Sequence, residues 1–147
     1  MPDWKKIGKR SKDKGKAFER DIAKRLTVLT GRRWRRTICS GGQYESYDVK
    51  CLDGGYPPIE CKNRKDITLE KVWKNPDILR SIVDEFSVMV FHSGSLNLCV
   101  VPCSMKSGLG FERATVVADL EIDGLPYWMF SLENFRVLEQ TNEKTTA

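Results

Sequence analysis

The sequence predicts an α/β domain with a mixed central β-sheet flanked by helices. Three observations support this fold class: a helical periodicity over residues 15–30, a glycine-centred hairpin pattern over residues 46–63, and two apolar runs at residues 87–91 and 97–101. Predicted helices and strands alternate along the chain, which is the order expected when helices cover a sheet. A chain of 147 residues suits one domain.

We expect this domain to occupy residues 15–140. Residues 1–14 hold six Lys/Arg and few apolar side chains, so they predict a flexible basic arm. That arm either wraps nucleic acid or only keeps the protein soluble. Residues 141–147 are polar and predict a disordered tail.

The segment 15–30 predicts an amphipathic helix. Phe18, Ile22, Leu26 and Leu29 recur at spacings of three and four, which places them on one face. Gly31 follows as a stop signal, because glycine readily adopts the left-handed conformation that ends a helix.

The other expected elements follow from apolar patterns and turn residues. The first is a strand in 32–40 that ends at the turn Ser40-Gly41-Gly42. Next come a helix at 67–73, with Trp73 in the core or a dimer interface, and a helix capped by Asn75. Strands follow at 87–91 and 97–101, then an ambiguous stretch at 103–126 with a possible strand at 114–118, an extended segment at 127–130 and a helix at 131–139.

Charge is distributed unevenly along the chain. Residues 1–74 hold 20 Lys/Arg against 10 Asp/Glu, whereas residues 75–147 hold 5 against 10. This asymmetry points either to a polyanion that meets the first half or to an ordinary solvated basic face. The chain has no apolar run long enough to cross a membrane and no secretory h-region, so we expect a cytoplasmic protein. Its five cysteines and single histidine argue against both a disulfide framework and a zinc site.

The hairpin pattern predicts which residues of its two strands face each other. If the turn is centred on Gly54, then Val49 faces Ile59 and Asp48 faces Glu60. Val49, Cys51, Ile59 and Cys61 then share one apolar face, and the other face holds Asp48, Glu60 and Lys62. Two directly opposed carboxylates repel each other unless a cation lies between them. An ordinary surface hairpin with cross-strand ion pairs is the alternative.

Glu19 is a third acid of interest. It lies at helical spacing from Ile22, Ala23 and Leu26, within the apolar stripe, where an uncompensated carboxylate is unfavourable. Either it turns towards the hairpin acids, or it extends to solvent at the edge of the stripe, or it pairs with a basic neighbour. The neighbours considered are Lys16, Arg20 and Arg32. Oxygen ligands from Glu19, Asp48 and Glu60 would suit Mg²⁺, with Mn²⁺ as a substitute, and Lys62 would hold a phosphate or an attacking water.

Basic side chains near these acids are candidate DNA contacts. Arg33 and Arg35 share one face of the predicted strand and would form a phosphate track beside Trp34, which either packs in the core or stacks on a base. Arg64 and Lys65 follow the Glu60 strand and are placed to contact phosphates.

This ordered set of residues resembles the PD-(D/E)XK nucleases. The resemblance rests on the helix acid Glu19, on Asp48-x11-Glu60-Cys61-Lys62, and on the turn Ser40-Gly41-Gly42. Together with Lys14-Gly15-Lys16 before Glu19, these motifs are most similar to archaeal-type Holliday-junction resolvases, which also occur in phages. Tyr47 stands where the motif name has proline. The resemblance covers roughly residues 14–102.

The resemblance implies a Mg²⁺-dependent, structure-selective endonuclease that resolves four-way junctions as a homodimer and leaves 5′-phosphate ends. It implies metal ligation by Glu19, Asp48, Glu60 and the Cys61 carbonyl, with Lys62 orienting water. It adds Lys14, Lys16 and Ser40 to the expected DNA contacts. A phage-encoded enzyme of this type would act in the host cytoplasm.

Two other functions remain open from the sequence. One keeps the chemistry on other DNA, as a restriction-type, nicking or exonuclease activity. The other is a non-catalytic nucleic-acid-binding module in which the acids are structural.

Overall fold

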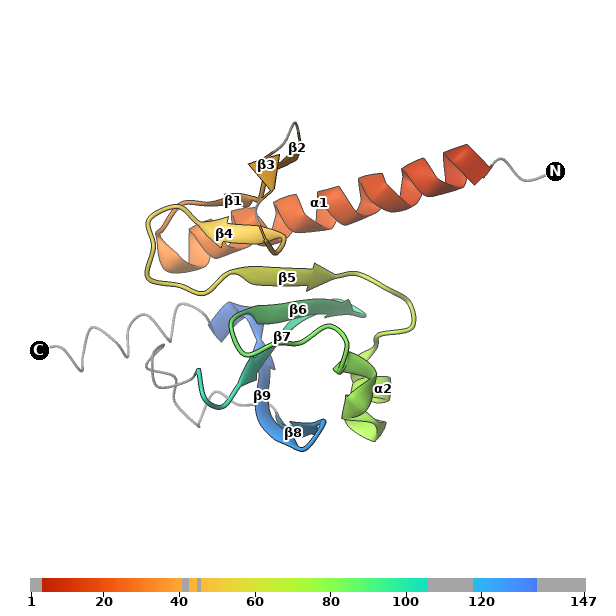
Figure 1. Ribbon diagram of the computed structural model, residues 1–147, viewed down its shortest axis with the longest axis vertical. Coiled ribbons are helices and arrows are strands. Elements are labelled where there is room, and N and C mark those ends of the chain that lie inside the picture. Colours follow the sequence, from red (N-terminus) through yellow and green to blue (C-terminus); the bar gives the residue numbers. More distant parts are fainter. Residues whose placement is uncertain (1–3, 41–42, 45, 106–117, 135–147) are drawn as a thin grey trace, which may run out of the picture.

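A computed structural model describes residues 4–40, 43–44, 46–105 and 118–134 (Figure 1). Its helical elements are α1 (Trp4–Thr30), α2 (Leu69–Lys74) and the 3-10 turns η1 (Pro76–Leu79) and η3 (Leu132–Asn134). Its strands are β1 (Trp34–Arg36), β2 (Cys39–Ser40), β3 (Gln43–Tyr44), β4 (Val49–Cys51), β5 (Ile59–Lys62), β6 (Val88–Ser93), β7 (Leu96–Pro102), β8 (Ala118–Ile122) and β9 (Leu125–Ser131). Within these ranges, no helix has the length and apolar character that a membrane crossing requires.

The main sheet is mixed, as the sequence predicts. In the described part of the chain, seven strands follow the order β1-β4-β5-β6-β7-β9-β8, and only β5 and β6 run parallel. The segment between β5 and β6 contains α2, so the parallel pair has the helical crossover that such pairs require. The predicted α/β fold class is therefore confirmed.

Helix α1 covers the sheet at the β1 end (Figure 1). Phe18, Ile22, Leu26 and Leu29 are all buried, which confirms the predicted stripe. The helix ends at Gly31, whose φ of +70° is the left-handed conformation expected after a helix.

The prediction for the chain ahead of residue 15 is wrong in one respect. Residues 4–14 continue α1 instead of forming an irregular arm. Their sequence lacks an apolar stripe, but lysine and arginine are good helix formers and extend a helix already nucleated on the core.

The β4–β5 hairpin has the predicted register. Val49 pairs with Ile59, and both side chains are completely buried. Gly54 and Gly55 have φ values of +73° and +87° and form the turn that the sequence indicates. Pairing is limited near this turn because Pro57 and Pro58 have no backbone N–H to donate.

The two faces of the sheet carry separate apolar cores. Val88 and Val90 of β6 pack in the α1 core, whereas Met89 and Phe91 of the same strand pack with residues of α2 and η1. This division follows from the alternation of side chains along a strand.

The C-terminal half differs more from expectation. The helix expected from Asn75 is only the short turn η1, and Asn75 makes no side-chain cap. Trp73 is 65% exposed, so the core alternative for it is wrong, and the dimer-interface alternative stays a prediction. The extended segment at 127–130 lies within β9, whereas only Ala118 of the possible strand 114–118 is described. Residues 135–139 of the expected last helix and the predicted tail lie outside the described residues.

Candidate active site

Asp48 lies at the point where β4 approaches β5. Its backbone N–H donates to the Ile59 carbonyl at 2.9 Å, and its carboxylate oxygen Oδ2 accepts a hydrogen bond from the Cys61 N–H at 2.8 Å. These two bonds fix the Asp48 side chain beside the centre of β5. The carboxylate therefore faces the Glu60–Lys62 segment rather than bulk solvent.

Glu60 lies next to Asp48 and shares its environment. Burial, followed by the negative charge of Asp48 and a hydrogen bond with Asp48, raises the pKa of Glu60 to about 7. The contribution of Asp48 to this shift requires the two acids to lie on the same side of the sheet. Asp48 and Glu60 thus form a close, half-buried carboxylate pair, as the predicted register requires.

Lys62 completes this group from the same strand. Its Nζ lies 3.6 Å from Glu60 Oε1, and its side chain is 34% exposed. Residues two apart on a strand share a face, so Lys62 follows Glu60 along the polar surface of β5. Its ammonium group lowers the pKa of Glu60, opposing the effects of burial and Asp48.

Glu19 approaches the pair from α1 but is bound by an arginine. Arg36 Nε donates to Glu19 Oε2 at 2.7 Å, and both side chains are largely buried. The partner is none of the candidates Lys16, Arg20 and Arg32 but comes from β1 instead. No local pattern indicates this pairing, because the two residues are brought together only when β1 packs on α1.

The three acids nevertheless all act on one residue, Cys61. Burial raises the pKa of the Cys61 thiol well above its ordinary value, and the charges of Asp48, Glu19 and Glu60 all contribute to the same direction. Cys61 itself is buried in the α1 core, and its backbone N–H donates to Asp48. Among the described residues, however, no three His, Cys, Asp or Glu side chains already form a metal-ligand group.

The donor set fits a hard divalent cation. Asp48 and Glu60 offer carboxylate oxygens side by side, and Mg²⁺ commonly uses only one or two carboxylates, its remaining positions being filled by water and substrate phosphate. Two close carboxylates are also the arrangement that a cation stabilises most. Glu19 would join them through water, or directly after exchanging its contact with Arg36.

Tyr47 gives Asp48 an unusual backbone setting. Its φ of +69° is rare for a residue other than glycine, and such strain often occurs next to functional residues. The Thr37 hydroxyl donates to the Tyr47 carbonyl at 2.6 Å, and the Tyr47 hydroxyl donates to Asp84 Oδ2 at 2.9 Å. These contacts hold the chain turn that directs Asp48 towards β5.

The expected DNA contacts lie in different settings. Arg33 binds Asp53 through its backbone and guanidinium, and Arg64 binds Asp66. Both arginine side chains are more than half exposed, and exposed ion pairs of this kind exchange readily with other anions. Arg35 donates to the Arg36 carbonyl at 2.7 Å. The remaining expected contacts are Lys14 and Lys16, exposed on α1, Lys65, exposed after β5, and Ser40, in β2. Trp34 is buried at 7% exposure, so the core alternative is correct for it.

Removing the partner of Glu19 is expected to destabilise the protein. Arg36→Gln leaves a largely buried carboxylate without its cation, so the free energy of unfolding in EDTA falls by about 1–2 kcal/mol. The double variant Glu19→Gln/Arg36→Gln recovers most of this loss, since the uncompensated charge is gone. Urea denaturation measures both, with the exposed Arg80→Gln as control. Equal stabilities of wild type and Arg36→Gln contradict the contact.

Stability of the metal-free protein is expected to depend on Glu60 ionisation. Because the folded-state pKa of Glu60 is raised to about 7, the folded protein binds more protons than the unfolded chain between pH 4.5 and 7, and stability falls as pH rises through this window. The Glu60→Gln substitution removes this pH-dependent loss of stability. The variant is therefore expected to be more stable than wild type at pH 8 by about 1–3 kcal/mol. Urea titrations in EDTA at both ends of the window test this. Glu121→Gln, exposed on β8, should behave as wild type.

A mixed sheet with a helix acid, a strand aspartate and Glu-x-Lys on the next strand defines the class of PD-(D/E)XK nucleases. A family model described as "Phage putative PDDEXK endonuclease" matches residues 10–83, just over half of the chain. The chain belongs to this phage endonuclease family. Comparisons with curated proteins and with solved structures found no match. The family implies a nuclease that acts on DNA, and PD-(D/E)XK nucleases generally use divalent metals.

Proposed function

We propose that this protein is a Mg²⁺-dependent, structure-selective DNA endonuclease that cleaves four-way junctions. The observation that supports it most is the pairing of Asp48 with Glu60, next to Lys62 on one face of β5. A close carboxylate pair is unfavourable by itself and becomes useful when it binds a cation. Mn²⁺ would replace Mg²⁺ in the same oxygen site.

Each residue of the site has a distinct role in this proposal. Asp48, Glu60 and the Cys61 carbonyl hold the cation, and Glu19 joins them through water or after release from Arg36. The bound cation would polarise the scissile phosphate and stabilise charge on the leaving oxygen. Lys62 holds the attacking water in line with phosphorus and offsets the charge that develops during attack. Hydrolysis then leaves 5′-phosphate and 3′-hydroxyl ends.

The four-way junction is the finer part of the proposal. It is supported by the similarity of Lys14-Gly15-Lys16 with Glu19, and of Ser40-Gly41-Gly42, to archaeal-type junction resolvases. A junction has two equivalent strands to cut, so we propose a homodimer with two active sites. Residues 15–140 form the single nuclease domain in this proposal, and the enzyme acts on DNA in the host cytoplasm. Light scattering with and without junction DNA measures the oligomeric state.

A substrate panel tests the proposal. Wild type and Asp48→Asn are incubated with Mg²⁺ and four DNAs of matched sequence: a four-way junction, a flap, a linear duplex and a single strand. The proposal predicts rapid cutting of the junction by wild type at paired positions and no cutting by Asp48→Asn. Preferential cutting of another DNA assigns the chemistry to a restriction-type, nicking or exonuclease activity. Binding without cleavage of any substrate identifies a non-catalytic module and contradicts the proposal.

A further inference from the structure

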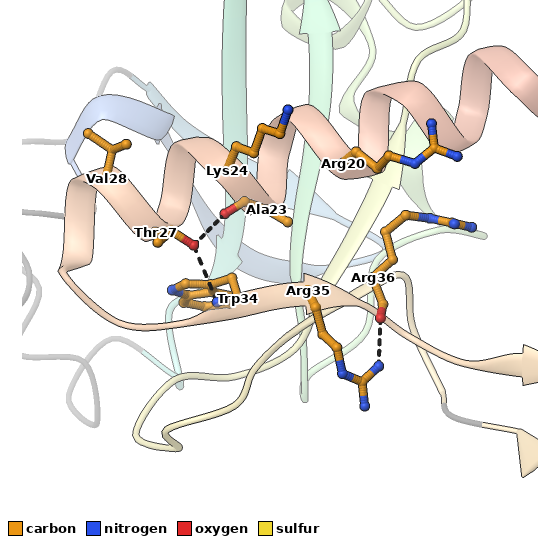
Figure 2. A pocket seen from close by; sticks show the side chains of 8 residues that line it. All are labelled: Arg20, Ala23, Lys24, Thr27, Val28, Trp34, Arg35 and Arg36. Atoms are coloured by element: carbon orange, nitrogen blue, oxygen red, sulfur yellow. Dashed lines mark hydrogen bonds between the residues drawn. The ribbon is translucent and has the colours of Figure 1, made fainter.

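A groove lies between α1 and β1, on the side of the helix away from the rest of the sheet (Figure 2). Its volume is about 690 Å³. Arg20 and Lys24 line it from α1, and Arg35 and Arg36 line it from β1. Among the eight described residues that line it, four are thus cationic and none is a carboxylate. This composition suits an anionic occupant.

The charges of the helix side remain available to a ligand. Arg20 and Lys24 are exposed, and within the described residues neither forms an ion pair with a carboxylate. Other cations near the site differ in this respect, since Arg33 and Arg64 are already paired with aspartates. A phosphate in the groove would therefore not have to displace an internal acid from Arg20 or Lys24.

The groove also offers apolar surface. Val28 is 72% exposed at one end, and Trp34 lies along the wall that β1 provides (Figure 2). A DNA duplex keeps its base faces stacked inside, so it would meet such a groove only with sugars and phosphates. An unpaired strand presents base faces and sugars as well as phosphates, and proteins bind it by combining cations with apolar surface.

Arg36 connects the groove to the candidate active site. Its guanidinium lies at the same end of the groove as that of Arg20, opposite Val28 (Figure 2), and its Nε binds Glu19. A strand lying in the groove would therefore run directly towards the acids around Cys61.

We infer that the α1–β1 groove binds an unpaired DNA strand, with phosphates on Arg20 and Lys24 and a base or sugar against Val28, and directs that strand to the active site. This inference rests on the proposed nuclease function. It adds a requirement for unpaired nucleotides next to the cleavage point, as occurs where a branch point opens or a single-stranded arm leaves a duplex.

Binding of a fluorescent oligothymidylate and of a hairpin duplex, measured by anisotropy, tests the inference. All proteins carry Asp48→Asn, so that binding is read without cleavage. Adding Arg20→Gln/Lys24→Gln is expected to weaken single-strand binding by roughly tenfold and to reduce its salt dependence, while duplex binding changes little. Val28→Glu places a negative charge in the groove at an exposed helix position and is expected to weaken single-strand binding selectively as well.

The matched control is Lys71→Gln/Arg80→Gln, which removes the same two charges from the exposed region of α2 and η1. It should leave both affinities unchanged. Unaltered single-strand binding in both groove variants overturns the inference, and so does an equal loss of single-strand and duplex binding. Cleavage by the protein without Asp48→Asn is measured separately with Mg²⁺. Its absence contradicts the proposed function, whereas cleavage with normal binding by the groove variants contradicts only the inference.

Discussion

Asp48→Asn is expected to reduce metal-dependent DNA cleavage by about a thousandfold or more. Asparagine keeps an oxygen that can accept the Cys61 N–H, so the local fold is retained. It removes the negative charge that pairs with Glu60 and that would bind the cation. The loss should therefore appear in the cleavage rate under single-turnover conditions, with little change in DNA affinity.

Glu60→Gln should have an effect of similar size, because either acid alone is a weak site for a divalent cation. Glu121→Gln, an exposed acid on β8, is the control and should cleave as wild type does. Circular dichroism checks that all three variants fold. Cleavage by Asp48→Asn at a rate close to wild type would remove Asp48 from the site.

Lys62→Ala is the second large effect and acts on the chemical step. The ammonium group of Lys62 lies on the Glu60 side of the carboxylate pair, where it can hold the attacking water and offset negative charge in the transition state. We expect a loss of about a hundredfold or more in the single-turnover rate. Because one phosphate contact among many contributes little to binding, DNA affinity should change by less than a few-fold.

The Lys62→Arg variant tests whether a positive charge is sufficient or whether the compact ammonium group is also required. It keeps the positive charge but not the compact ammonium geometry, so it should recover part of the rate. Lys71→Ala, an exposed residue of α2, is the matched control. If Lys62→Ala weakened DNA binding as much as cleavage, Lys62 would be a binding residue rather than one that assists attack.

The hairpin and its polar face were predictable because several local signals agree. The glycines of the turn and the alternation of Val49 and Ile59 with polar residues both select one register. Since side chains alternate strictly along strands, that register places Asp48, Glu60 and Lys62 together. The α1 stripe was predictable for the same reason, as one spacing pattern explains every buried position from Phe18 to Leu29.

The partner of Glu19 was not predictable in this way. Candidate cations close in sequence were considered, but Arg36 reaches Glu19 only through the packing of β1 on α1. A pattern of four arginines around Trp34 gives no indication of which one turns towards the helix. Arg20 and Lys24 were missed as groove residues because the groove itself exists only between two elements.

Strand β8 had a local signal that the ambiguous segment obscured. Ala118, Leu120 and Ile122 are buried, and the residues between them are exposed, so the alternation typical of a strand is present. Asp123 and Gly124, with φ values of +51° and +77°, form the tight turn to β9 that an Asp-Gly pair favours. The exposed Trp73 is the opposite case, since its helical spacing from Leu69 predicts burial and α2 is too short to cover it.

Calorimetric titration of Mn²⁺ into the DNA-free protein tests most directly whether Asp48 and Glu60 hold a divalent cation. We predict saturable binding to wild type and to Lys71→Gln, and its loss in Asp48→Asn and in Glu60→Gln. Undiminished Mn²⁺ binding by Asp48→Asn would contradict the account, because the cation would then be held somewhere other than between these two carboxylates.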